Sequence, residues 1–143
     1  MDVTTLQFFE TFYPDFNGQH HLEIRKLPGG KQAFCRTIGE AVKAASDTSL
    51  NVYFGVTLRD GQNGDEAHAS LLSALWADVD AKDFDGDKGK ADEAIGRFEF
   101  QPSVVVDSGG GFHCYWLLRE AEEITEGNRA YVRGIELGIA EAI

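Results

Sequence analysis

Two aspartates stand two residues apart at the end of an apolar segment, in Asp78-Val79-Asp80. If the segment 74–81 is a β-strand, successive side chains alternate between its faces, so Asp78 and Asp80 point the same way. Neighbouring carboxylates repel each other unless a cation lies between them, and Mg²⁺ and Mn²⁺ prefer oxygen ligands. The spacing indicates a divalent-metal site of the kind used in phosphoryl transfer. The alternative is an acidic strand end that leads into a solvated loop.

A second candidate motif is the glycine-rich segment Ser108-Gly109-Gly110-Gly111, which lies just before His113. Three glycines between two β-prone runs let the backbone approach a ligand closely, and their amides can form a concavity that binds phosphate. His113 could then reach the phosphates of a nucleotide, with Ser108 beside it as a hydroxyl donor. The alternative is a glycine-rich hairpin turn followed by a partly exposed histidine.

Together, the two motifs resemble those of the archaeo-eukaryotic primase superfamily, in its branch of phages, plasmids and integrated elements. In that family, one strand carries two metal-binding aspartates, matched here by the segment 75–80 (LWADVD). A second motif of Ser and His around glycines is matched by Ser108 and His113. The resemblance implies that Asp78 and Asp80 are catalytic ligands of Mg²⁺ or Mn²⁺. It also implies that His113 is a catalytic residue that contacts the nucleotide.

The resemblance covers residues 50–120 well and the first 50 residues only loosely. Because the segment 52–59 (VYFGVTLR) is similar to the strand before the first motif, Arg59 is a candidate phosphate or template contact. A surface arginine after a strand is the alternative. The family's third motif supplies another metal-binding acid from a later strand, and no residue of this chain matches it. The last helical pattern runs to Ile143 without a Gly or Pro stop signal, so we expect the N-terminal portion of a longer protein.

The implied function is that of a DNA primase or polymerase, a nucleotidyltransferase that makes or extends primers in the replication of a phage, plasmid or other mobile element. In such a reaction a 3′-hydroxyl attacks the α-phosphate of the incoming nucleotide. The implied partners are nucleoside triphosphates, a single-stranded DNA template and a fused or separate replicative helicase. The alternative is a non-catalytic nucleotide- or nucleic-acid-binding module of a larger replication protein, which the missing third acid favours.

Two other kinds of site match the sequence less well. A rolling-circle initiator holds a metal with two histidines separated by one apolar residue, whereas His20 and His21 are adjacent. The acidic segment 83–87 has the spacing of the start of a calcium-binding EF-hand loop. However, Lys88 stands where that loop has glycine, and Ala94 stands where it has glutamate.

The elements that must position these residues follow from hydrophobic periodicity and from capping and turn signals. Hairpins mixed with βαβ units predict an α+β fold, with a mixed, largely antiparallel sheet and packed helices. We expect one primase-polymerase-like catalytic domain over residues 1–143. The predicted helices cover 4–13, 38–45, 65–72, 91–98 and 125–143, and the predicted strands cover 21–27, 32–36, 51–58, 74–81, 102–107 and 112–118.

Composition sets limits on the function. The net charge of −11 argues against a domain that simply coats nucleic acid, but an acidic pocket that holds a metal ion carries such charge by design. No apolar run approaches the ~20 residues of a membrane-spanning helix, and the first residues lack the basic start of a signal peptide. We therefore expect no membrane partner and a cytoplasmic location. Two cysteines, Cys35 and Cys114, are too few for a disulfide framework or a zinc cluster.

Overall fold

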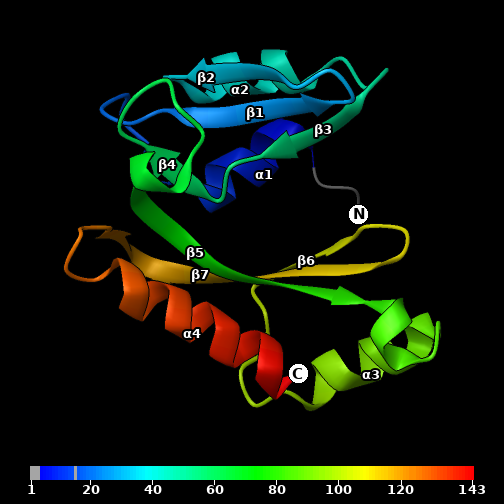
Figure 1. Cartoon of the computed structure of the whole chain (residues 1–143). Helices are drawn as coiled ribbons and strands as arrows, with labels where there is room; N and C mark the ends of the chain where they lie inside the picture. Colours follow the sequence, from blue (N-terminus) through cyan, green and yellow to red (C-terminus); the bar gives the residue numbers. More distant parts are fainter. Residues whose placement is uncertain (1–3, 15) are drawn as a thin grey trace. The chain divides into compact units, whose positions relative to one another are not determined.

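A computed structural model describes residues 4–14 and 16–143 and has an α+β fold (Figure 1). Contacts group the chain into two compact units. Unit 1 consists of Met1–Ser73 and Glu120–Ile124, and unit 2 consists of Ala74–Arg119 and Thr125–Ile143. The predicted fold class is confirmed, whereas the single catalytic domain over 1–143 stays a prediction.

The elements fall into two antiparallel sheets, with strand orders β2-β1-β3 and β4-β5-β7-β6. The helices are α1 (Thr5–Phe12), α2 (Ile38–Ala45), α3 (Lys88–Arg97) and α4 (Arg129–Ala142), with the short 3₁₀ helices η1 (Glu66–His68) and η2 (Ala81–Phe84). The strands are β1 (Leu22–Leu27), β2 (Lys31–Cys35), β3 (Asn51–Phe54), β4 (Thr57–Arg59), β5 (Ala69–Asp80), β6 (Val104–Asp107) and β7 (Gly111–Glu123).

Unit 1 is built around the three-stranded sheet, in which β1 pairs antiparallel with both β2 and β3. Helix α1 begins with a capping box, in which the side chains of Thr4 and Gln7 each accept from the backbone N–H of the other. Phe9 and Phe12 of this helix are buried, and their rings meet Phe54 of β3 at centroid distances of 6.1 and 5.2 Å. These edge-on aromatic contacts are part of the core of unit 1, together with buried strand residues such as Leu22 and Ile24.

The predicted single strand over 51–58 is wrong, because the chain changes sheets between β3 and β4. At the break, the N–H of Gly55 donates to the carbonyl of Glu23 at 2.9 Å, and the hydroxyl of Tyr13 donates to the carbonyl of Gly55. A Cβ atom at Gly55 would lie 3.3 Å from the carbonyl oxygen of Thr57, so a larger residue would be crowded there. An apolar run shows that a segment is extended but not which partner each half pairs with.

The predicted helix over 65–72 is also wrong. Only the 3₁₀ helix η1 forms, closed by a 2.6 Å contact between Asp65 and the Nδ1 atom of His68, and β5 begins at the next residue. Leu71 and Leu72 pair with Leu58 and Thr57 of β4 as part of this 12-residue strand. Short apolar runs suit a helix or a strand equally, and here the pairing with β4 decides for the strand.

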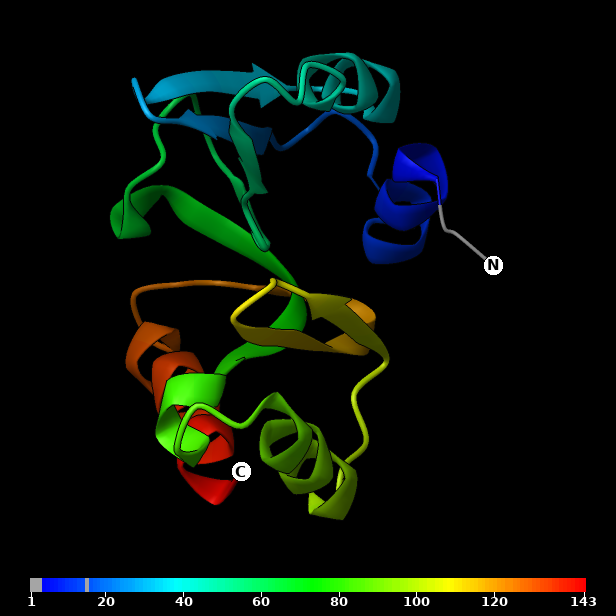
Figure 2. The same ribbon diagram turned by 90° about the vertical axis from the view of Figure 1, so that its right-hand side faces the viewer.

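In unit 2, the helices α3 and α4 lie on one side of β5 and β7 (Figures 1 and 2). Helix α3 begins at the N-cap Asp87, whose carboxylate accepts from the backbone N–H groups of Gly89 and Lys90. On this side, Val79 of β5 and Cys114 of β7 pack against α3 in a hydrophobic cluster. Its buried members are Val79, Ala91, Ile95 and Cys114, and Phe84, Phe112, Trp116 and Ile143 pack around them. Across 4–14 and 16–143, no helix has the combined length and apolarity that a membrane crossing needs.

Candidate functional site

The two aspartates lie on the side of β5 that faces away from this cluster. Ala77 and Val79 are buried, whereas the side chains of Asp78 and Asp80 are 55% and 39% exposed. This alternation follows from the two-residue period of a strand. The carboxylate of Asp80 is also fixed locally, because it caps η2 by accepting from the backbone N–H of Lys82 at 2.9 Å. Both carboxylates therefore face the same side of β5.

His113 lies beside Asp78. Strand β7 is the neighbour of β5 in the sheet, and the Nε2 atom of His113 is 3.8 Å from the Oδ1 atom of Asp78. This separation is too long for a hydrogen bond but short enough for both groups to contact one ligand. The structure thus brings together an acid and an imidazole that are far apart in the sequence.

The glycine turn is joined directly to the acidic motif. The N–H of Ala81 donates to the carbonyl of Gly110 at 2.9 Å. A Cβ atom at Gly111 would collide with the carbonyl oxygen of Val79 and would lie 2.8 Å from the Cα atom of Asp80. Only glycine allows β7 to begin this close to the backbone that carries the carboxylates.

Two backbone amides of the glycine turn are already hydrogen-bonded within the turn. The turn closes the antiparallel hairpin of β6 and β7, as the hairpin interpretation predicts. The N–H of Ser108 donates to the carbonyl of Gly111 at 3.1 Å, and the N–H of Gly109 donates to the carboxylate of Asp107 at 2.8 Å. Phosphate binding through these two amides, predicted for Ser108 and the glycines, would therefore have to replace these bonds.

Asp107 lies on the other face of the sheet from His113. It pairs with Phe112 across the hairpin, and directly paired residues of antiparallel strands point to the same face. Phe112 packs in the helix-covered cluster, so Asp107 points toward that side. This direction removes Asp107 as a source of a third carboxylate next to Asp78.

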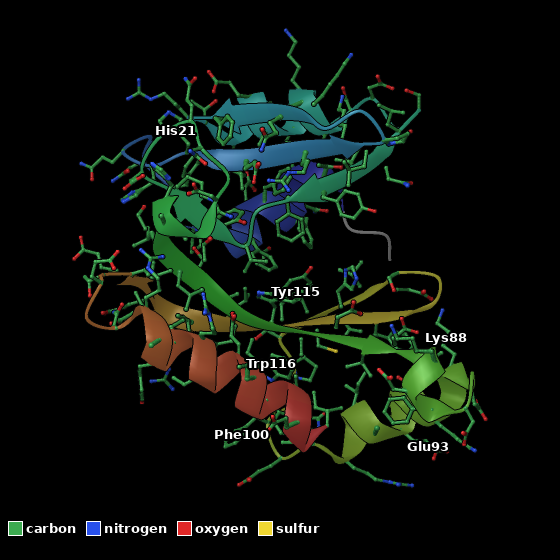
Figure 3. All side chains as sticks on the ribbon, in the orientation of Figure 1. His21, Lys88, Glu93, Phe100, Tyr115 and Trp116 are labelled. Carbon is green, nitrogen blue, oxygen red and sulfur yellow. The ribbon has the colours of Figure 1, made fainter. Side chains whose placement is uncertain are left out.

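Lys88 is a residue that the sequence did not single out for this region. At the start of α3, its Nζ atom lies 2.6 Å from the Oδ1 atom of Asp107 and 5.1 Å from the ring centre of Phe112 (Figure 3). The hydrogen bond from Lys88, followed by that from the Gly109 amide, lowers the pKa of Asp107. In the sequence, Lys88 is visible only as the residue that interrupts a calcium-loop pattern.

We expect the contribution of this ion pair to depend on pH. Because the pKa of Asp107 is lowered in the folded state, the stabilisation is present at neutral pH and is lost as the pH falls through that lowered pKa. Lys88→Met should therefore reduce the free energy of unfolding at neutral pH but not in acid, and should raise the pKa of Asp107. Urea unfolding at several pH values and a carboxyl NMR titration measure both effects. A destabilisation that is equal at all pH values would contradict this expectation.

The two aromatic residues that follow His113 on β7, Tyr115 and Trp116, differ in their burial and contacts. Tyr115 and Trp116 project from opposite faces of β7 (Figure 3). Tyr115 is only 5% exposed; burial, followed by the negative charge of Asp78, raises its pKa to about 12. The indole N–H of Trp116 donates to the carbonyl of Phe100 at 2.8 Å, which fixes this ring in the packing of unit 2. Tyr115 is therefore too buried for stacking, and Trp116 belongs to the packing of unit 2.

Arg59 belongs to unit 1, whereas the acids, the glycine turn and His113 belong to unit 2. One guanidinium nitrogen of Arg59 donates to the carbonyl of Asp65 at 2.8 Å, within its own loop. The role of Arg59 as a phosphate or template contact stays a prediction.

The described residues include no preformed metal site, and Asp78, Asp80 and His113 do not form one. Among residues 4–14 and 16–143, no group of three or more His, Cys, Asp or Glu side chains is arranged to hold a metal ion. This includes the acidic segment 83–87, where Asp87 caps α3 and Asp85 lies 3.6 Å from Lys90. The calcium interpretation therefore has no preformed site in the described structure.

Comparisons with known proteins do not add a relative. No family model matches the chain, and neither a curated protein nor a solved structure matches it. The interpretation of the site consequently depends on its residues and their geometry.

Proposed function

We propose that unit 2 carries the nucleotide site of a metal-dependent primase or polymerase, which makes or extends primers on single-stranded DNA. The observation that supports this most is the proximity of His113 to Asp78, at 3.8 Å, on the side of the sheet that α3 and α4 leave uncovered. Asp78 beside an imidazole, with Asp80 on the same side of β5, offers carboxylate ligands for a cation and a donor for a phosphate oxygen.

Asp78 and Asp80 fit Mg²⁺ or Mn²⁺. Mg²⁺ is usually bound by one or two carboxylates, with waters and substrate phosphates in the other positions. Among the residues that the structure describes, no third ligand joins these two carboxylates, which suits an ion that arrives with a triphosphate better than a permanently bound ion. When bound, the ion would supply neutralisation of the triphosphate charge and activation of the attacking hydroxyl.

The protein's own groups would orient the nucleotide. The Lys82 amide fixes the Oδ1 atom of Asp80, and the Lys82 ammonium lies 3.6 Å from its Oδ2 atom, so a metal ion would compete with this ion pair. His113, whose side chain is 36% exposed, would donate to a phosphate oxygen, and the exposed Ser108 hydroxyl would donate to another. Gly111 and Gly110 would keep these donors close to the carboxylates.

A template-dependent incorporation assay tests the proposal. With Mn²⁺, a primed and an unprimed single-stranded DNA, and labelled ribo- and deoxynucleoside triphosphates, the protein should form products. His113→Ala should lower the rate about 100-fold, the size of effect expected when one donor to a developing charge is lost. His20→Ala, in unit 1, is the matched control and should retain the rate. Equal rates for His113→Ala and the wild type would contradict the assigned role.

A second candidate function is a nucleotide-binding module without catalysis. The incomplete ligand set and the internally bonded amides of Ser108 and Gly109 favour it. In that case, Mn²⁺-dependent nucleotide binding would be measurable by calorimetry and would weaken in His113→Ala, while the wild type would incorporate no nucleotide.

A further inference from the structure

Trp76 is an exposed aromatic residue on the same strand as the two carboxylates. It precedes Asp78 by two residues, so its side chain emerges on the same side of β5. Its exposed fraction is 42%, whereas Trp116 is held by its bond to Phe100 and by an edge-on contact with Phe98 at 5.8 Å. A large ring that stays in water next to a polar site is available to bind a flat ligand group.

We infer that Trp76 is the platform on which the base of the bound nucleotide stacks, an inference that rests on the proposed function. Residues two apart in a strand are separated by about 7 Å. The base of a nucleotide is separated from its phosphates by the sugar, which is a span of similar length. A triphosphate at Asp78 and His113 can therefore extend its base along β5 to Trp76.

The chemistry of this platform defines the class of ligand. An indole ring stacks on any nucleobase, because every base has a π face, so the contact selects nucleotides over other polyphosphates without selecting one base. Tyr115, the aromatic neighbour of His113 on β7, is buried and cannot serve instead. Selection for a base at this site therefore depends on Trp76.

Two ligands separate the phosphate contribution from the base contribution. ATP and inorganic tripolyphosphate each carry three linked phosphates, but only ATP has a sugar and a base. In titration calorimetry with Mn²⁺, the wild type should bind ATP about 5- to 150-fold more tightly than tripolyphosphate, which is the range for one base–aromatic contact. Trp76→Ala should abolish this difference and leave the affinity for tripolyphosphate unchanged.

Two further variants exclude a general loss of structure. Trp76→Phe keeps an aromatic face and should retain part of the preference for ATP. Tyr131→Ala removes another exposed ring, 73% exposed, from α4, and should retain all of it. ATP should also quench the fluorescence of the wild type but not that of Trp76→Phe, in which Trp116 is the remaining tryptophan.

The outcomes distinguish this inference from the function on which it rests. If the wild type binds both ligands equally, and Trp76→Ala changes neither affinity, the base platform is wrong while the metal–phosphate site stands. If the wild type binds neither ligand with Mn²⁺, the proposed nucleotide site and the base platform fail together.

Discussion

The double variant Asp78→Asn/Asp80→Asn is expected to lower template-dependent incorporation by at least about 1,000-fold, the upper end of what one group that stabilises developing charge contributes. Asparagine keeps the size of each side chain but removes both negative charges, so a divalent ion loses its protein ligands. The fold should remain, because both side chains are substantially exposed. Incorporation kinetics and Mn²⁺ titration calorimetry measure the two losses.

Asp83→Asn is the matched control for this variant. Asp83 is an exposed acid on η2, close to Asp80 in the sequence but outside the pair. The substitution lowers the negative charge of the region without removing a proposed ligand. The incorporation rate of Asp83→Asn should stay within about twofold of the wild type, as for an exposed group whose charge is screened. If Asp83→Asn lost as much activity as the double variant, general charge rather than ligation would be responsible.

Gly111→Ala is expected to destabilise the protein by about 3 kcal/mol, the upper end of the range for an overpacked site. The added methyl group would collide with the carbonyl of Val79 and crowd the Cα atom of Asp80. Both obstacles are backbone atoms, so they cannot move aside as a flexible side chain would. Urea unfolding, monitored by tryptophan fluorescence, measures the change.

Gly110→Ala is the control, and it is one position away. A Cβ atom at Gly110 meets no atom within 4 Å, so we expect a change within about 0.5 kcal/mol, as for other surface substitutions. If both substitutions were equally harmless, the close approach of Gly111 to β5 would be incorrect. If both were equally harmful, the turn would be sensitive to any side chain rather than to this contact.

The orientation of the acids could be predicted from the sequence, whereas their proximity to His113 could not. That Asp78 and Asp80 share a face follows from the period of any strand. That β7, rather than another strand, pairs with β5 depends on contacts between segments distant in the chain. In the sequence, this proximity is predicted only through the resemblance of the two motifs to a known family, and that family assignment stays a prediction.

The parts that sequence reasoning missed are those decided by long-range pairing. The break at Gly55 depends on the different strands that β3 and β4 pair with. The absence of a helix over 65–72 depends on the pairing of β5 with β4. The direction of Asp107 cannot be predicted from the sequence, because alternation close to a turn cannot be followed without the partner strand. Its pairing with Phe112 and its bond to Lys88 supply that direction.

The bond between Ala81 and Gly110 also determines where this protein could tolerate an insertion. A residue added between Ser108 and Gly110 would lengthen an exposed loop and leave both strands unchanged. A residue added between Trp76 and Asp78 would shift the end of β5 by one position and exchange its two faces, so that both carboxylates would turn toward α3. A change of length in the turn should therefore disturb the fold less than a change of length in the strand.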